Sequence, residues 1–196
     1  MSGAPTSVVD PRALEALIRA GWAETDLAWE TRQAEAAEHD ASGRHDAAAA
    51  LWAEGLRLAR EAFAGNDPRL AASLANQAHG LRRAGRDQAA RGLFEEALLA
   101  WDASGPWVAA LAPERRARSS TFHLRLEAKH PGGYAHHSRE RYEALAAEGR
   151  AALLALRDGA PPPFDGPARW AKERPEGYTD ARKLMAAVLL VAAHRV

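Results

Sequence analysis

Apolar and small residues recur along most of this chain three or four positions apart, which is the spacing of one face of an α-helix. The pattern is clearest in two segments that align without a gap, GRHDAAAALWAEGLRLA at 43–59 and GRDQAARGLFEEALLAW at 85–101. Gly43 and Gly85 open these segments, lie 42 positions apart, and allow tight turns between antiparallel helices. The pattern therefore predicts helical hairpins, which must stack because one hairpin cannot bury its apolar face alone.

Small and aromatic residues repeat at fixed distances after each turn glycine. A small residue follows after five positions, an aromatic residue after nine, and a second small residue after twelve. The pairs are Ala48 and Ala90, Trp52 and Phe94, and Gly55 and Ala97. Because a small side chain lets two helices approach closely and a ring fills the space between hairpins, we expect these positions at helix contacts.

This spacing resembles that of tetratricopeptide (TPR) repeats. The preceding segment NDPRLAASLANQA, at 66–78, is similar to the kinesin-light-chain subtype of TPR repeat. The matching residues are Asp67, Pro68, Ala71, Leu74, Asn76 and Ala78. The resemblance covers residues 43–101 best, and it implies a curved array whose concave face is formed by the first helix of each hairpin.

The flanking segments extend the array less regularly. Residues 11–40 have helical spacing, but Arg32 stands where the next repeat has Leu74, so the first repeat is degenerate. A third hairpin is expected from helices at 113–129 and 137–156, with Gly133 as its turn glycine. The predicted fold is all-α, a short TPR-like array of two to three hairpins with a C-terminal capping or packing helix. Its parts are a tail at 1–10, a repeat domain at 11–158, a Pro/Gly-rich linker at 159–178 and an apolar helix at 179–196.

Composition supports an all-α interpretation and narrows the environment. Alanine, leucine, arginine and glutamate, all good helix formers, dominate the sequence. The formal net charge is +0, so we expect no overall positive potential that would attract nucleic acid. There is no cysteine, which excludes a disulfide. The longest apolar stretch, 184–193, is shorter than the about 20 residues that cross a bilayer, and no secretory signal is visible. We therefore expect a cytoplasmic protein without a membrane partner.

The TPR resemblance implies a site for a partner segment on the first helix of the second hairpin. The implied concave residues are Ala72, Ala75, Asn76, His79, Arg82 and Arg83. In kinesin-light-chain-like repeats an asparagine at the place of Asn76 bonds the backbone of an extended peptide, and a carboxamide offers the donor and the acceptor that this requires. In the alternative interpretation, Asn76 bridges two helices of the array.

Arginines suggest what such a groove would bind. Arg82 and Arg83 end the implied helix, and Arg118 could join them from the next hairpin. Because guanidinium groups bind carboxylates through paired hydrogen bonds, we expect an acidic or carboxyl-terminal partner segment. The alternative is a solvated arginine face, partly neutralised by nearby acidic residues.

One histidine-rich segment suggests a different function. His123, Glu127 and His130 are spaced i, i+4 and i+7, and His136 and His137 follow. On a helix the first three would share a face suited to zinc or iron, so a metal-binding enzyme or sensor is the alternative function. A second Glu-x-x-His pair is missing, which favours histidines that face water, and we expect no metal or cofactor.

The favoured function is a protein-interaction module, an adaptor, scaffold or assembly factor. The sequence has no phosphate-binding glycine loop, dinucleotide fingerprint or nucleophile elbow, so an enzyme is not expected. An RNA-binding array that uses the arginines is disfavoured because the aromatic residues take core positions. The apolar C-terminal helix must be buried, either against the last hairpin or in a homodimer.

Overall fold

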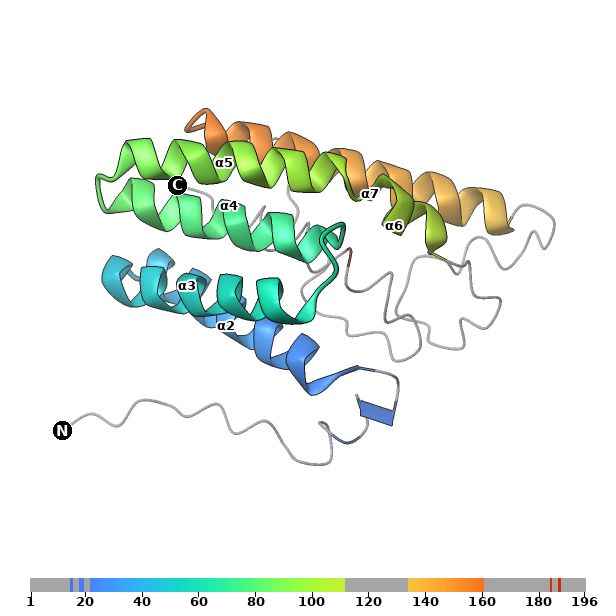
Figure 1. The fold of residues 1–196 in the computed structure, drawn as a ribbon, viewed down its shortest axis with the longest axis horizontal. Coiled ribbons are helices and arrows are strands. Elements are labelled where there is room, and N and C mark those ends of the chain that lie inside the picture. The colour runs from blue at the N-terminus through green and yellow to red at the C-terminus, as the bar shows by residue number, and fades with distance from the viewer. Residues whose placement is uncertain are drawn as a thin grey trace.

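In the computed structural model, the secondary structure of the described part of the chain consists of helices joined by turns and short loops (Figure 1). Those residues are 22–111 and 134–160, with the single positions 15, 18, 19, 184 and 187. The helices are α2 (Glu24–Ala41), α3 (His45–Ala62), α4 (Pro68–Arg83), α5 (Asp87–Asp102), α6 (Gly105–Ala110) and α7 (Tyr134–Arg157). The predicted all-α class is confirmed, and none of these helices has the length and hydropathy needed to cross a membrane.

Two similar hairpins form the centre of the array. Helix α2 pairs with α3 and α4 pairs with α5, and each pair is joined by a three-residue turn. Gly43 and Gly85 have φ angles of +75° and +73°, which only glycine adopts without strain. The peptide N–H of Gly43 donates to the Asp40 carbonyl, and that of Gly85 to the Arg82 carbonyl, both at 2.9 Å. The predicted turn glycines are therefore confirmed.

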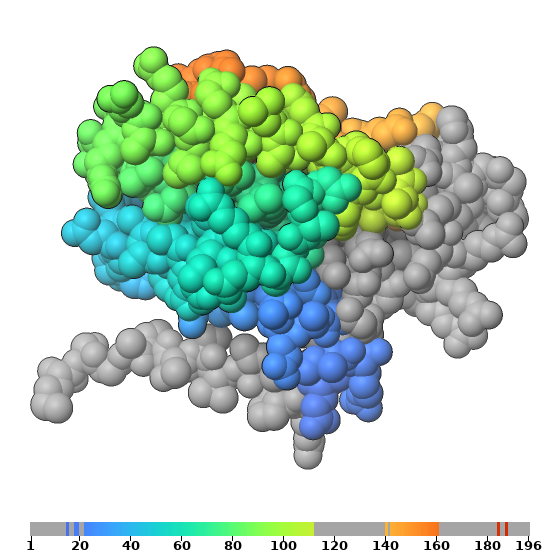
Figure 2. Space-filling view, in the orientation of Figure 1, coloured from blue at the N-terminus to red at the C-terminus, as the bar shows by residue number. Residues whose placement is uncertain are grey.

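The repeated small and aromatic positions lie at helix contacts, as predicted. Trp52 and Phe94 are buried, at 0% and 1% exposure. A Cβ atom on Gly55 would lie 2.5 Å from the Gln33 amide nitrogen, so the missing side chain is what lets α2 approach α3. In the face shown in Figure 2, atoms of the two hairpins meet directly. Between the hairpins, Trp52 of α3 lies against Gly80 of α4, so at least this residue of the repeat pattern lies where they stack.

Helix α4 is the centre of this packing. It begins at Asp67, whose side chain accepts a hydrogen bond from the Arg69 peptide N–H at 2.9 Å, with Pro68 at the first helical position. Positions 71–76 and 78–80 are all buried, because α4 packs against α3, α5 and α7 and bonds to α2. A helix surrounded in this way leaves little of its surface to solvent.

Helix α7 extends the array on the far side of α5. We expected a helix at 137–156, and α7 runs over Tyr134–Arg157, where it packs on α5 and α4 (Figure 1). It ends in a third glycine turn, with Gly159 at φ +73°. Its predicted hairpin partner at 113–129 lies outside the described residues.

Some details differ from the expectations. The helical spacing predicted at 11–40 is interrupted, because Ala23 is extended and α2 starts at Glu24. Asp26 accepts a hydrogen bond from the Ala23 peptide N–H at 3.0 Å, which fixes this start. The short helix α6 was not expected, and its Trp107 is half-buried against the core.

The C-terminal apolar segment reaches the core. Leu184 and Ala187, both helical, are 0% exposed and belong to the cluster of buried residues that includes Leu153 and Leu156 of α7. At least these two positions are therefore buried within one chain. The rest of the expected helix at 179–196, like the linker before it, lies outside the described residues, and a homodimer through it stays a prediction.

Candidate functional site

Asn76, the predicted peptide-binding residue, lies between two helices. Its side chain is 0% exposed, and its Nδ2 donates to Oε1 of Gln33 in α2 at 2.7 Å. Gln33 in turn donates to the Ser73 hydroxyl at 3.2 Å, and the Trp29 indole N–H donates to the same hydroxyl at 2.7 Å. This arrangement corresponds to the alternative interpretation, in which Asn76 bridges helices. A partner segment would reach the amide only if α2 moved away.

His79 and Arg83 both lie close to the Asp40 carboxylate, near the turns that join the helices of each hairpin. Asp40 accepts from His79 Nε2 at 3.1 Å and pairs with His45 Nδ1 at 2.8 Å, while Arg83 Nε lies 3.7 Å away. Burial lowers the pKa of His79 below its ordinary value, although Asp40 opposes this shift. Burial also opposes ionisation of Asp40, but hydrogen bonds from the two histidines keep its pKa below the ordinary value.

Arg82 bonds to the end of α7. Its guanidinium donates to the carbonyl of Leu156 and, at 2.6 Å, to the carbonyl of Arg157, and it stacks over the Phe94 ring with 4.6 Å to the centroid. These carbonyls belong to the last turn of the helix, where a cation is favourable. Arg82 therefore holds α7 against the second hairpin.

The predicted partner-binding residues do not share one open groove within the described part of the chain. Asn76 and His79 are buried, Arg82 bonds to α7, and Arg83, with a side chain 38% exposed, faces Asp40 and His45. Arg118 lies outside the described residues. Binding of a partner segment by these five residues stays a prediction.

The metal candidates come from the histidine-rich segment at 123–137. His123, Glu127 and His130 lie outside the described residues, and of His136 and His137 only the backbone, in α7, is described. Within the described ranges no group of three histidine or carboxylate side chains is arranged to hold a metal ion.

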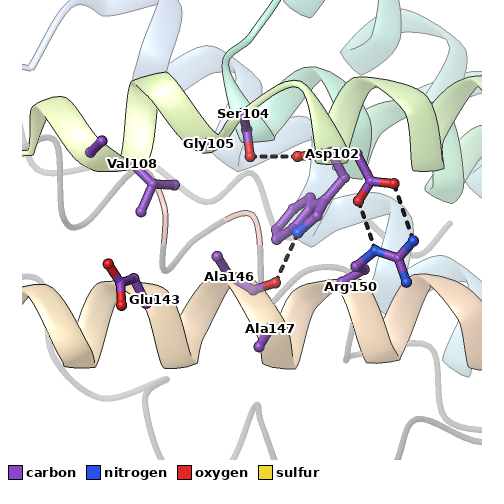
Figure 3. Close-up of a pocket in the computed structure, with 10 residues that line it drawn as sticks. Asp102, Ser104, Gly105, Val108, Glu143, Ala146, Ala147 and Arg150 are labelled. Carbon is purple, nitrogen blue, oxygen red and sulfur yellow. Dashed lines mark hydrogen bonds and ion pairs between the residues drawn. The ribbon is translucent and has the colours of Figure 1, made fainter.

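An open cleft, not predicted from the sequence, lies where α5 and α6 face α7 (Figure 3). Its volume is about 360 Å³. Its residues are Trp101, Asp102, Ser104, Gly105, Val108, Ala109, Glu143, Ala146, Ala147 and Arg150. Most of these side chains are small, so the facing helices leave a hollow between them.

Two contacts fix the width of the cleft at one end. The Trp101 indole N–H donates to the Ala146 carbonyl at 2.8 Å, and Arg150 binds Asp102 through two hydrogen bonds of 2.7 and 3.1 Å. The bonds from Arg150 lower the pKa of Asp102 below its ordinary value. Glu143 lies one to two turns along α7 from these contacts, at the other end of the cleft in Figure 3.

Sequence reasoning missed the cleft because its walls are far apart in the chain. One wall is residues 101–109 and the other is 143–150. A usable signal was present: Glu143, Ala146, Ala147 and Arg150 are spaced i, i+3, i+4 and i+7, so they share one helical face in which the middle positions are small. Which element that face meets could not be read from the spacing.

Comparison of the chain with models of protein families, with curated proteins and with solved structures finds no match. The resemblance to TPR repeats consequently depends on the residues between Gly43 and Trp101 that carry it.

Proposed function

We propose that this protein is an interaction module, a short TPR-like helical array that acts as an adaptor, scaffold or assembly factor. In this proposal it holds a segment of a partner protein in the cleft between α6 and α7. The observation that carries the proposal is the cleft itself, a hollow of about 360 Å³ with an apolar lining and charged side chains at its edges. Apolar concave sites with a few polar groups are where proteins most often bind ligands.

The two similar hairpins support the array part of the proposal. Each hairpin has a glycine turn, with φ of +75° in the first and +73° in the second. Each also buries an aromatic ring at the equivalent position, Trp52 in the first hairpin and Phe94 in the second. Stacked hairpins of this kind give extended surfaces that suit the binding of other chains. The arginines at the end of α4 are not part of the proposed site, because Arg82 bonds to α7 and Arg83 lies beside Asp40.

A displayed peptide library tests the proposal. Peptides selected on the purified wild-type protein should bind a variant with Ala147→Arg at least about tenfold more weakly, because the new side chain fills the cleft. Ala147 is exposed on a helix, so the substitution should leave the fold intact, which circular dichroism verifies. Ala53→Arg, at an exposed position of α3 outside the cleft, is the matched control. Equal affinity of both variants for every selected peptide would contradict the proposal.

A further inference from the structure

The charges that line the cleft do not cancel. Asp102 and Arg150 neutralise each other through their two hydrogen bonds. Glu143 is exposed and has no hydrogen bond or ion pair within the described part of the chain, so the lining carries one uncompensated negative charge. A cleft with one such charge attracts a cation and repels an anion.

The remaining lining is apolar apart from Ser104, whose hydroxyl donates to the Trp101 carbonyl at 2.6 Å. Figure 3 shows Val108 of α6 across from Glu143, with Ala146 and Ala147 between Glu143 and Arg150 along α7. The Trp101 ring lies near Arg150, since its indole N–H donates to the Ala146 carbonyl at 2.8 Å. Such a surface favours a methylene chain, which can lie along it while a charged group at the tip stays in contact with water. The Glu143 carboxylate, which has no partner among the described residues, lies beside this apolar path on the same face of α7.

We propose that the cleft selects a basic side chain, lysine or arginine, from the partner segment. The methylene stem packs between α6 and α7, and the ammonium or guanidinium group pairs with Glu143. Arg150 does not form an equivalent ion pair with an acidic side chain of the partner, because its guanidinium already binds both carboxylate oxygens of Asp102. This inference rests on the proposed function, since it names the chemistry of what the cleft binds.

Synthetic peptides that differ at one position test the selectivity. One peptide selected on the wild-type protein is synthesised in four versions. They carry lysine, arginine, norleucine or glutamate at the single position whose substitution weakens binding most. Norleucine keeps the methylene stem of lysine and removes its charge. Because an exposed ion pair contributes modestly, we expect lysine and arginine to bind about two- to fivefold more tightly than norleucine, and glutamate to bind more weakly than norleucine. High salt should reduce the difference between lysine and norleucine.

Two substitutions assign the preference to Glu143. With Glu143→Gln, the lysine and norleucine peptides should bind equally, at the affinity that norleucine has for the wild type. With Glu143→Lys, the glutamate peptide should bind better than the lysine peptide. Glu38→Gln, an exposed position of α2 outside the cleft, should leave the preference for lysine unchanged.

The outcomes separate this inference from the proposed function. If Ala147→Arg abolishes peptide binding but lysine and norleucine bind the wild type equally, the selectivity for a basic side chain is wrong and the cleft remains the site. A preference for lysine that survives Glu143→Gln also overturns the inference. If Ala147→Arg has no effect on any peptide, the proposed function itself fails.

Discussion

Arg69 shows how single charged residues hold the hairpins in register. Its side chain is 5% exposed, it pairs with Asp67 at 2.6 Å and with Asp26 of α2, and its guanidinium lies 3.5 Å from the centroid of the Phe63 ring. Burial opposes the charge of Arg69, but the hydrogen bonds to Asp67 and Asp26 raise its pKa above the ordinary value. Because all three ions are buried, removing one of them leaves a buried charge without its partner, which is costly.

Removing the guanidinium should therefore destabilise the fold strongly. We expect Arg69→Met to lower the free energy of unfolding by about 3–5 kcal/mol, because two buried carboxylates lose their partner. Arg57→Met is the control, since Arg57 and Glu61 form a pair with side chains 57% and 58% exposed. That variant should lose about 0–1 kcal/mol in the same urea titration. Similar losses for both variants would contradict the role of burial.

His79 should make stability depend on pH. Its pKa is lowered in the folded protein, so the unfolded chain takes up a proton first as the pH falls through 6.5, and the stability present above that value is lost below it. Asp40, Arg82 and Arg83 are the charged groups that act on it. We expect the free energy of unfolding to fall less between about pH 8 and pH 5 in His79→Gln than in the wild type. Equal pH dependence in urea titrations would show that His79 does not contribute.

At the scale of the helix, two of the contacts between neighbouring helices place an aromatic ring of one helix against a glycine of the other. A Cβ atom on Gly80 of α4 would lie 2.8 Å from the Trp52 ring of α3, and a Cβ atom on Gly149 of α7 would overlap the Trp101 ring of α5. The distance between the helices therefore depends on the missing side chain. The alternation of large and small residues along a helix thus decides which helices can dock.

The glycines of α5 and α7 allow a matched comparison. Gly149→Ala should lower the free energy of unfolding by about 1–3 kcal/mol, because α7 or the Trp101 ring must shift to make room. Gly92→Ala, in the middle of α5, meets nothing within 4 Å. It should raise stability by about 0.5–1 kcal/mol, because alanine is the better helix former. Denaturant titration of both variants would contradict the packing argument if the two changes had the same sign.

At the scale of the whole molecule, one core joins the array to the end of the chain. The cluster of buried residues includes Leu74 of α4, Phe94 of α5 and Leu153 of α7, and also Leu184. Residues of distant segments that share a core unfold together, because exposing one removes the packing of the others. The C-terminal segment is therefore part of the cooperative unit through at least Leu184 and Ala187.

Substitution of Leu184 tests this cooperativity. We expect Leu184→Ala to lower the free energy of unfolding by about 2–5 kcal/mol in a single transition that α-helical circular dichroism and tryptophan fluorescence report alike. Leu99→Ala, at a side chain 72% exposed, should change it by less than about 0.5 kcal/mol. Two separate transitions in the Leu184 variant would show that the C-terminal segment folds independently of the hairpins.

The sequence by itself determined the local features of this protein. Helical periodicity, the turn glycines Gly43 and Gly85, and the ring positions Trp52 and Phe94 could be read because each depends on residues close in the chain. The cleft proposed as the binding site was not predicted from the sequence. Of the residues grouped around Asp40, His79 and Arg83 were identified as candidates, but Asp40 was not.

Only the tertiary structure decided what lies between the helices. It placed Gln33 against Asn76, used Arg82 to hold α7, and brought residues 101–109 opposite 143–150 to leave a cleft. A helical pattern fixes which face of a helix is apolar, but not which helix will cover that face or how closely. Those outcomes depend on the fit of side chains from segments far apart in the chain, which is settled only when the chain packs.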